Sequence, residues 1–122
     1  MWNHDDLSAR IIGAAIDVHR TLGPGFVESI YEAALAIELA ARGLTIERQV
    51  ELHVRFKGHV VGVHRLDLIV EALIVVELKA IRSIEAVHYG VVRSYMRAAG
   101  VTHGLLINFG STPLDTRRVT IG

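Results

Sequence analysis

The chain of 122 residues contains no cysteine. Disulfide bonds, thiolate metal sites and cysteine nucleophiles are therefore excluded, and this composition fits a cytoplasmic protein best. The longest apolar runs, such as 73–76, are far too short to cross a bilayer. The polar segment 1–6 lacks the pattern of a secretory signal. We therefore expect a cytoplasmic protein that does not act at a membrane.

The sequence also lacks an excess of either charge, since its formal net charge is zero. Proteins that bind duplex nucleic acid nonspecifically usually carry a net basic surface, because phosphate neutralisation drives their affinity. A nucleic-acid enzyme of this composition would need a local basic patch or a bound cation. Hydrophobic residues make up 51% and prolines number only two, which is typical of a folded chain. The length fits a single domain over 1–122.

Three segments have the apolar spacing of amphipathic helices. The first is expected to begin at Asp5 or Asp6, either of which can cap it, and to end before Gly23. The second is expected over 27–42 and the third from 83 or 84 to 99. A glycine follows each of them and stops the helix.

Between the second and third helices the apolar residues alternate with polar ones, which is the period of a strand. Strands are expected over 50–57, 60–70 and 74–79, followed after the third helix by 105–109 and an edge strand at 117–121. The order α-α-β-β-β-α-β predicts an α/β fold. Its antiparallel three-strand meander belongs to a mixed sheet flanked by helices, which the strand after the third helix joins by a crossover.

Two carboxylates lie within otherwise apolar strands. Asp67 and Glu77 occupy positions where ionised groups are costly to bury unless they are paired or bound to a cation. A two-residue turn between these strands would put the acids on opposite faces of the sheet. A three-residue loop pairs Val70 with Ile74 and places the acids opposite each other. We predict the three-residue loop, with Lys79 farther along on the same face.

Two facing carboxylates beside a lysine form a suitable site for Mg²⁺ or Mn²⁺, because hard cations prefer oxygen ligands and retain several waters. The backbone carbonyl of Leu78, between Glu77 and Lys79, could add a ligand. Lys79 could orient a water or stabilise charge on a phosphate. The same cluster could instead be an ion-pair network across two strands, since short motifs also occur without function.

These residues resemble a known signature. Asp67 followed by Glu77-Leu78-Lys79 is similar to the motif of the PD-(D/E)XK nuclease superfamily, although Leu66 stands where the nominal motif has proline. The segment 25–31, Gly-Phe-Val-Glu-Ser-Ile-Tyr, resembles the motif that names the GxxExxY protein family. The resemblance extends from about Ile11 to Arg118. Three further segments similar to that family follow in the same order: 66–70, 76–80 and 104–110.

The resemblance implies a nuclease-like domain of bacterial type with Asp67, Glu77 and Lys79 in its active site. It also implies that Glu28 faces this site from the second helix. From the residues alone, Glu28 could equally favour the helix dipole. Tyr31 could close the pocket or contact a substrate, or it could be a core aromatic residue with a hydrogen-bonded hydroxyl group.

Four other residues are candidates near this site. Relatives in the family often carry a glutamine four residues before a tyrosine in the third helix, whereas here Val91 precedes Tyr95, a candidate substrate contact. His88 could transfer a proton, or it could be a helix histidine whose polar atoms have partners. Arg65 shares the face of the aspartate and could touch phosphate or pair with an acid. His64 could replace an aromatic residue of the family pattern.

We expect a metal-dependent nuclease that hydrolyses DNA or RNA with Mg²⁺ or Mn²⁺ as its cofactor. The alternative is a catalytically inactive nuclease-fold module for nucleic-acid or protein binding, which Val91 and the balanced charge favour. A phosphodiesterase for a smaller substrate is a third hypothesis, and the fold by itself does not separate these functions. A homodimer could complete a binding groove for a chain this small.

Overall fold

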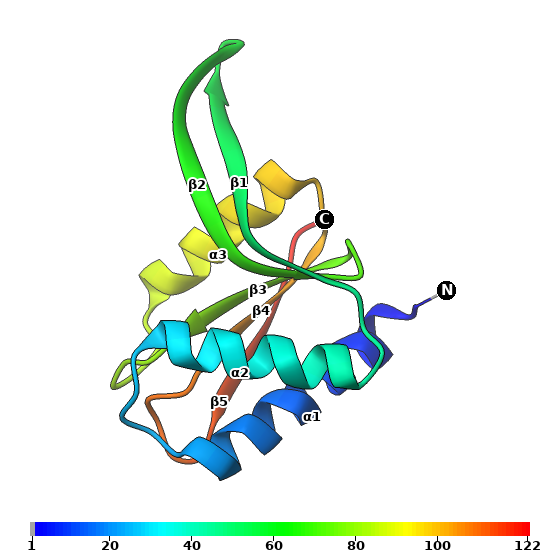
Figure 1. Cartoon of the computed structure of the whole chain (residues 1–122). Helices are drawn as coiled ribbons and strands as arrows, with labels where there is room; N and C mark the ends of the chain where they lie inside the picture. The colour runs from blue at the N-terminus through cyan, green and yellow to red at the C-terminus, as the bar shows by residue number, and fades with distance from the viewer. Residues whose placement is uncertain (1) are drawn as a thin grey trace.

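Three helices and five strands form the fold in a computed structural model that describes residues 2–122 (Figure 1). The sheet has the order β1-β2-β3-β4-β5. Neighbouring strands are antiparallel except β3 and β4, which are parallel. The elements are α1 (His4–Leu22), α2 (Glu28–Ala41), β1 (Ile46–Phe56), β2 (His59–Val70), β3 (Ile74–Lys79), α3 (Ala86–Ala99), β4 (His103–Asn108) and β5 (Asp115–Thr120).

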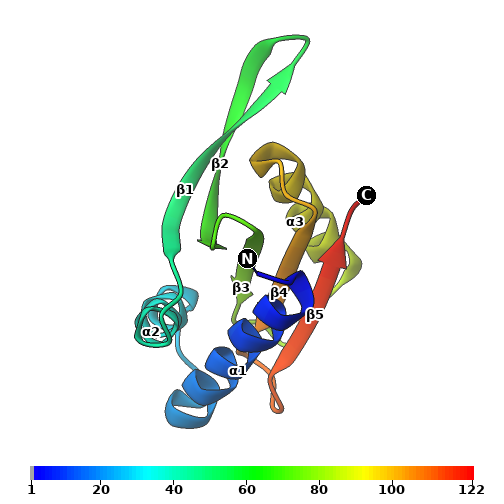
Figure 2. The ribbon, with the colours of Figure 1, turned by 90° about the vertical axis from the view of Figure 1, so that its right-hand side faces the viewer.

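The sheet lies between two helical layers, with α1 and α2 on one face and α3 on the other (Figure 2). The alternation along β3 divides the core, because successive side chains point to opposite faces. Ile74 and Val76 pack with residues of α1 and α2, whereas Val75 packs with Val92 and Met96 of α3. Helix α3 is the crossover that the parallel pair β3 and β4 requires. The expected α/β fold with a mixed sheet is confirmed.

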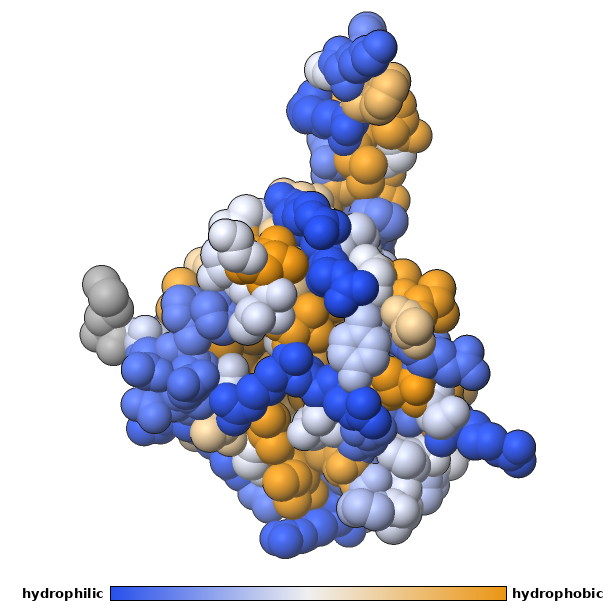
Figure 3. Space-filling model, turned by 180° about the vertical axis from the view of Figure 1, so that it is seen from behind, coloured by the Kyte–Doolittle hydropathy of each residue, from blue (hydrophilic) through white to orange (hydrophobic). Residues whose placement is uncertain are grey.

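The hairpin of β1 and β2 extends well beyond the other strands as a projecting arm (Figure 1). Only its base is paired with β3, where the ladder runs from Val70–Ile74 to Leu68–Val76. Apolar side chains gather on the arm's surface (Figure 3). They are Phe56, Val60, Val61 and Val63.

Several element boundaries differ from the sequence-based prediction. Helix α1 begins at His4, because the Asn3 side chain, and not Asp5 or Asp6, accepts hydrogen bonds at its start. Strand β1 begins four residues earlier than predicted, since Ile46 pairs with Val70. The edge strand expected over 117–121 is β5, which begins two residues earlier, at Asp115, and pairs along its whole length with β4. No helix within residues 2–122 has the length and apolarity needed to cross a membrane.

The connection between β2 and β3 has the predicted length of three residues, and Val70 pairs with Ile74. Glu71 and Ala72 adopt left-handed backbone angles, with φ of 53° and 54°, a region that residues other than glycine rarely occupy. The Glu71 side chain holds the loop, because its carboxylate accepts hydrogen bonds from the Trp2 indole and the Thr45 amide. The loop that sets the register is therefore tied to the segment that precedes α1 and to the segment that follows α2.

Candidate active site

The predicted acids meet at a fork between two strands. The β2–β3 ladder ends at the pair Leu68–Val76, one step before Asp67 and Glu77. Beyond that point β2 turns away into the arm, and the amide of Leu78 donates instead to Asp67 Oδ2 at 2.9 Å. The aspartate therefore takes a place that a strand carbonyl would otherwise occupy, and its second oxygen is left for other partners.

Glu77 is the most perturbed acid of the site. The residue is only 5% exposed. Burial, a hydrogen bond shared with Asp67 and the charge of Asp67 raise the pKa of Glu77 to about 9, while the charge of Lys79 acts in the opposite direction. Two carboxylates this close cannot both ionise cheaply in a buried place. The pair therefore holds a proton at neutral pH unless a cation takes its place.

Lys79 lies beside this pair, on the face predicted for it. Its Nζ atom is 3.6 Å from Glu77 Oε2, and its side chain is 24% exposed. The ammonium is thus near enough to attract the carboxylate and still open to solvent.

Glu28, at the first position of α2, approaches the acid pair from the layer that α1 and α2 form. Its charge also raises the pKa of Glu77, so the two carboxylates lie within electrostatic reach of each other. The Oε2 atom of Glu28 is buried and has no hydrogen-bond partner among the described residues. A buried carboxylate oxygen without a partner is costly unless a cation supplies the missing interaction.

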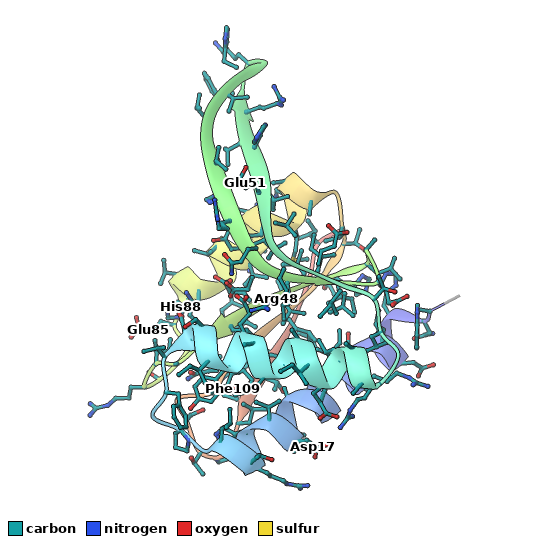
Figure 4. The ribbon with its side chains drawn as sticks, in the orientation of Figure 1. Asp17, Arg48, Glu51, Glu85, His88 and Phe109 are labelled. Atoms are coloured by element: carbon teal, nitrogen blue, oxygen red, sulfur yellow. The ribbon has the colours of Figure 1, made fainter. Side chains whose placement is uncertain are left out.

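A second acid on α2 provides a direct contrast. Glu32 lies one helical turn after Glu28. Its carboxylate accepts hydrogen bonds from the Arg48 guanidinium and from the side-chain amide of Gln49. The ion pair between Arg48 and Glu32 measures 3.0 Å, and Figure 4 shows Arg48 between α2 and the base of the arm. The same helix face therefore carries one acid with its own partners and one without.

Two residues on β4 and after it fix the segment that follows Lys79. The Asn108 side chain is fully buried, accepts from the amides of Ile81 and Gly110, and donates to the Ile81 carbonyl oxygen. A Cβ atom at Gly110 would lie 2.3 Å from that carbonyl oxygen, so only glycine fits. Asn108 has no role in the sequence-based prediction, although an asparagine within a buried apolar strand is a usable signal.

Tyr95 of α3 lies near the acids. Burial and the negative charges of Glu77 and Asp67 raise the pKa of its phenol. Its ring stands edge-on to that of His64, with the centroids 4.8 Å apart. The structure thus brings this candidate substrate contact to the site.

The other candidates lie in different surroundings. Tyr31 is fully buried and stacks on Phe109, and its hydroxyl donates to the Gly23 carbonyl oxygen. His88 accepts a hydrogen bond from the Glu85 amide in a capping box at the start of α3 (Figure 4). Arg65 is exposed on the arm and pairs with Glu51. The observed contacts are therefore those of a core aromatic residue for Tyr31, of a helix histidine with a hydrogen-bond partner for His88, and of an arginine paired with an acid for Arg65.

The donor set suits a hard divalent cation. Asp67 and Glu77 offer carboxylate oxygens from neighbouring strands, and Glu28 offers a buried oxygen without a partner. Within residues 2–122 no three His, Cys, Asp or Glu side chains already converge closely enough to bind one ion. Asp67 and Glu77 are the two carboxylates that the site brings together. A pocket of about 470 Å³ opens beside Glu28 and Ala80, and its lining includes neither Asp67 nor Glu77.

Comparisons with known proteins agree with this fold. The family model described as "PD-(D/E)XK nuclease superfamily" matches residues 5–119. A solved structure titled "Crystal structure of SSO0001" is similar, with a TM-score of 0.57 and 20% identity, covering 75% of this chain and 48% of that one. The chain spans about half the length of that structure, and at this identity the likeness shows the fold alone. No curated protein matches the sequence.

Proposed function

Because the chain belongs to the PD-(D/E)XK nuclease superfamily, we propose that it hydrolyses phosphodiester bonds in DNA or RNA with Mg²⁺ or Mn²⁺. One observation carries this proposal. Asp67 and Glu77 share a buried site with an unpartnered oxygen of Glu28 nearby, and Lys79 is the cation paired there. Without a metal, a proton on the acid pair and the Lys79 ammonium offset the negative charge of the pair, but the Glu28 oxygen has no partner; a divalent cation would engage all three carboxylates.

The residues of the site would have separate roles. Asp67, Glu77 and the Leu78 carbonyl group would hold the cation, with Glu28 as a further ligand or as a general base. The bound cation would supply polarisation of a phosphoryl oxygen and a lowered pKa for water. The Lys79 ammonium, held near Glu77 and open to solvent, would orient a water molecule or stabilise the charge that develops on the phosphate.

The segment after Lys79 would need to stay fixed for this geometry to be productive. Asn108 and Gly110 hold the backbone at Ile81, and catalysis is sensitive to small displacements of positioned groups. We therefore assign Asn108 as a positioning residue, acting through the chain segment that carries Lys79.

Cleavage of labelled single-stranded and double-stranded oligonucleotides in Mg²⁺ or Mn²⁺ tests the proposal. We expect cleavage by the native chain and a loss of at least about 100-fold in Asp67→Asn, Glu77→Gln and Lys79→Met. Glu47→Gln, which changes an exposed carboxylate on β1, is the control and should retain activity. Cleavage that survives Glu77→Gln would place the reaction elsewhere.

A module that keeps the nuclease fold without cleaving is the second candidate, and Val91 supports it. This residue lies on α3, on the element that also carries Tyr95, where a polar side chain was expected from the family pattern. If the native chain binds Mg²⁺ or Mn²⁺ but cleaves neither oligonucleotides nor a small phosphodiester such as bis(p-nitrophenyl) phosphate, this second function is favoured.

A further inference from the structure

A second cleft lies between the arm and the C-terminal half of α3. It has a volume of about 520 Å³, and its lining includes His53, Arg55 and His64 of the arm and Ser94 and Arg97 of α3. The charged and titratable side chains in its lining are two arginines and two histidines, all of them basic. The cleft belongs to neither the acid cluster nor the pocket beside Glu28.

The cleft is part of a wider division of charge that the balanced composition conceals. From Leu52 to Leu66 the arm contains Arg55, Lys57, Arg65 and three histidines, but no acid. Helix α3 also contains no acid, while α1 and α2 carry all of the helical carboxylates. A basic surface therefore covers the arm and α3 side of the molecule, although the net charge is zero.

The two arginines of the cleft are available to a ligand. No carboxylate within residues 2–122 forms an ion pair with Arg55 or Arg97, and both residues are exposed. Arg65, in contrast, is already paired with Glu51. Unpaired arginines that converge on one cleft are well suited to phosphate, because the guanidinium presents several donors in a fixed plane.

The cleft leads to the acid cluster. His64 lines the cleft, and its ring contacts that of Tyr95 at 4.8 Å between centroids. Tyr95 in turn lies within electrostatic reach of Glu77 and Asp67. A chain of phosphates held in the cleft would therefore continue past Tyr95 toward the carboxylates.

We propose that this cleft binds the sugar-phosphate backbone of single-stranded nucleic acid and directs the strand to the acid cluster. That the strand is directed toward the acid cluster rests on the proposed function. Single strands are favoured over duplexes because the cleft has the volume of a small-ligand pocket, which one or two flexible nucleotides can enter. The exposed Phe56 and neighbouring Lys57 at the arm tip offer the combination of an aromatic ring and a basic group that single-strand binders use.

Fluorescence anisotropy of a labelled single-stranded oligonucleotide tests the proposal, in EDTA and on a Glu77→Gln background so that no cleavage occurs. We expect Arg55→Ala/Arg97→Ala to weaken binding about tenfold or more and to lower the salt slope by about 1.4, since each lost phosphate contact on a single strand contributes about 0.7. Arg55→Lys/Arg97→Lys should restore most of the binding and the slope.

The matched control is Arg10→Ala/Arg20→Ala, which removes the same charge from α1 on the opposite layer. Arg20 and Arg97 each lie in the last turn of their helix, so their effects on the helix ends are comparable. The control should bind as tightly as the parent. Equal loss in both pairs, tighter binding of a duplex of the same sequence, displacement by an acidic polypeptide as readily as by oligonucleotide, or no binding at low ionic strength would overturn the proposal.

This assay separates the cleft from the proposed function. If the strand binds as expected but the native chain cleaves nothing in any divalent cation, the binding role of the cleft is supported and the nuclease activity is contradicted. If the chain cleaves a small phosphodiester but does not bind the strand, the hydrolytic activity is supported and the binding role of the cleft is contradicted.

Discussion

At the scale of the residue, Glu77 links stability to function. Burial and the neighbouring Asp67 raise its pKa to about 9, far above that of an unfolded glutamate. Between pH 4.5 and 9 the folded chain holds this proton and the unfolded chain does not, so the free energy of unfolding falls as the pH rises through this window. A carboxylate pair of this kind costs stability in the absence of a cation.

We therefore predict that Glu77→Gln stabilises the metal-free chain at pH 8 by roughly 1–3 kcal/mol and has little effect near pH 4.5. Glutamine keeps the shape and a hydrogen-bond donor but has no proton to lose. Urea unfolding in EDTA at several pH values measures this difference, with Glu47→Gln as the exposed control. A difference that does not change between pH 5 and 8 would contradict the raised pKa.

Gly110 is the residue with the least room for a side chain. Its Cβ would lie 2.3 Å from the Ile81 carbonyl oxygen and 2.6 Å from the Ile81 amide, both of them backbone atoms that cannot rotate away. Gly110→Ala should reduce the free energy of unfolding by roughly 1–3 kcal/mol. Gly62→Ala is the control, since nothing lies within 4 Å of that position, and it should stay within about 0.5 kcal/mol.

At the scale of the element, the loop between β2 and β3 decides which side chains face the site. A shift of one residue in strand register would move Asp67 to the other face of the sheet. The loop reaches its three-residue form with two left-handed residues, neither of them glycine. The contacts of Glu71 with Trp2 and Thr45 compensate for that conformation.

Ala72→Gly should therefore increase the free energy of unfolding by about 0.5–1 kcal/mol. The left-handed conformation costs alanine about 1–2 kcal/mol, and the greater freedom of glycine in the unfolded chain offsets only part of this gain. Ala40→Gly, in the right-handed conformation of α2, should instead lower stability by up to about 1 kcal/mol. Chemical denaturation of both variants provides the test, and a loss of stability in Ala72→Gly would contradict it.

At the scale of the whole molecule, the site exists only where three elements meet. Strands β2 and β3 supply the acids, and α2 adds Glu28. A cation that binds this arrangement and not the unfolded chain must stabilise the fold, by about 2.7 kcal/mol at a concentration 100-fold above its Kd.

We predict that Mn²⁺ or Mg²⁺ raises the unfolding temperature of the native chain, and that Asp67→Asn removes this increase. Glu28→Gln should reduce the increase, whereas Glu32→Gln should retain it, because Glu32 already has Arg48 and Gln49 as partners. Thermal unfolding with and without the ion measures each increment, so a change in basal stability does not confuse the comparison. Equal increments in the two glutamate variants would remove Glu28 from the proposed ligands.

The sequence by itself determined the helices and strands, the mixed sheet and the convergence of Asp67, Glu77 and Lys79. Strand period fixes the face of each side chain, and only a three-residue connection between β2 and β3 puts Asp67 and Glu77 on the same face. Contacts between elements distant in the chain were decided by the tertiary structure alone. Packing placed Tyr31 in the core and gave Glu32 partners that Glu28 lacks. The basic cleft likewise exists only because the arm folds beside α3, a proximity that no local pattern encodes.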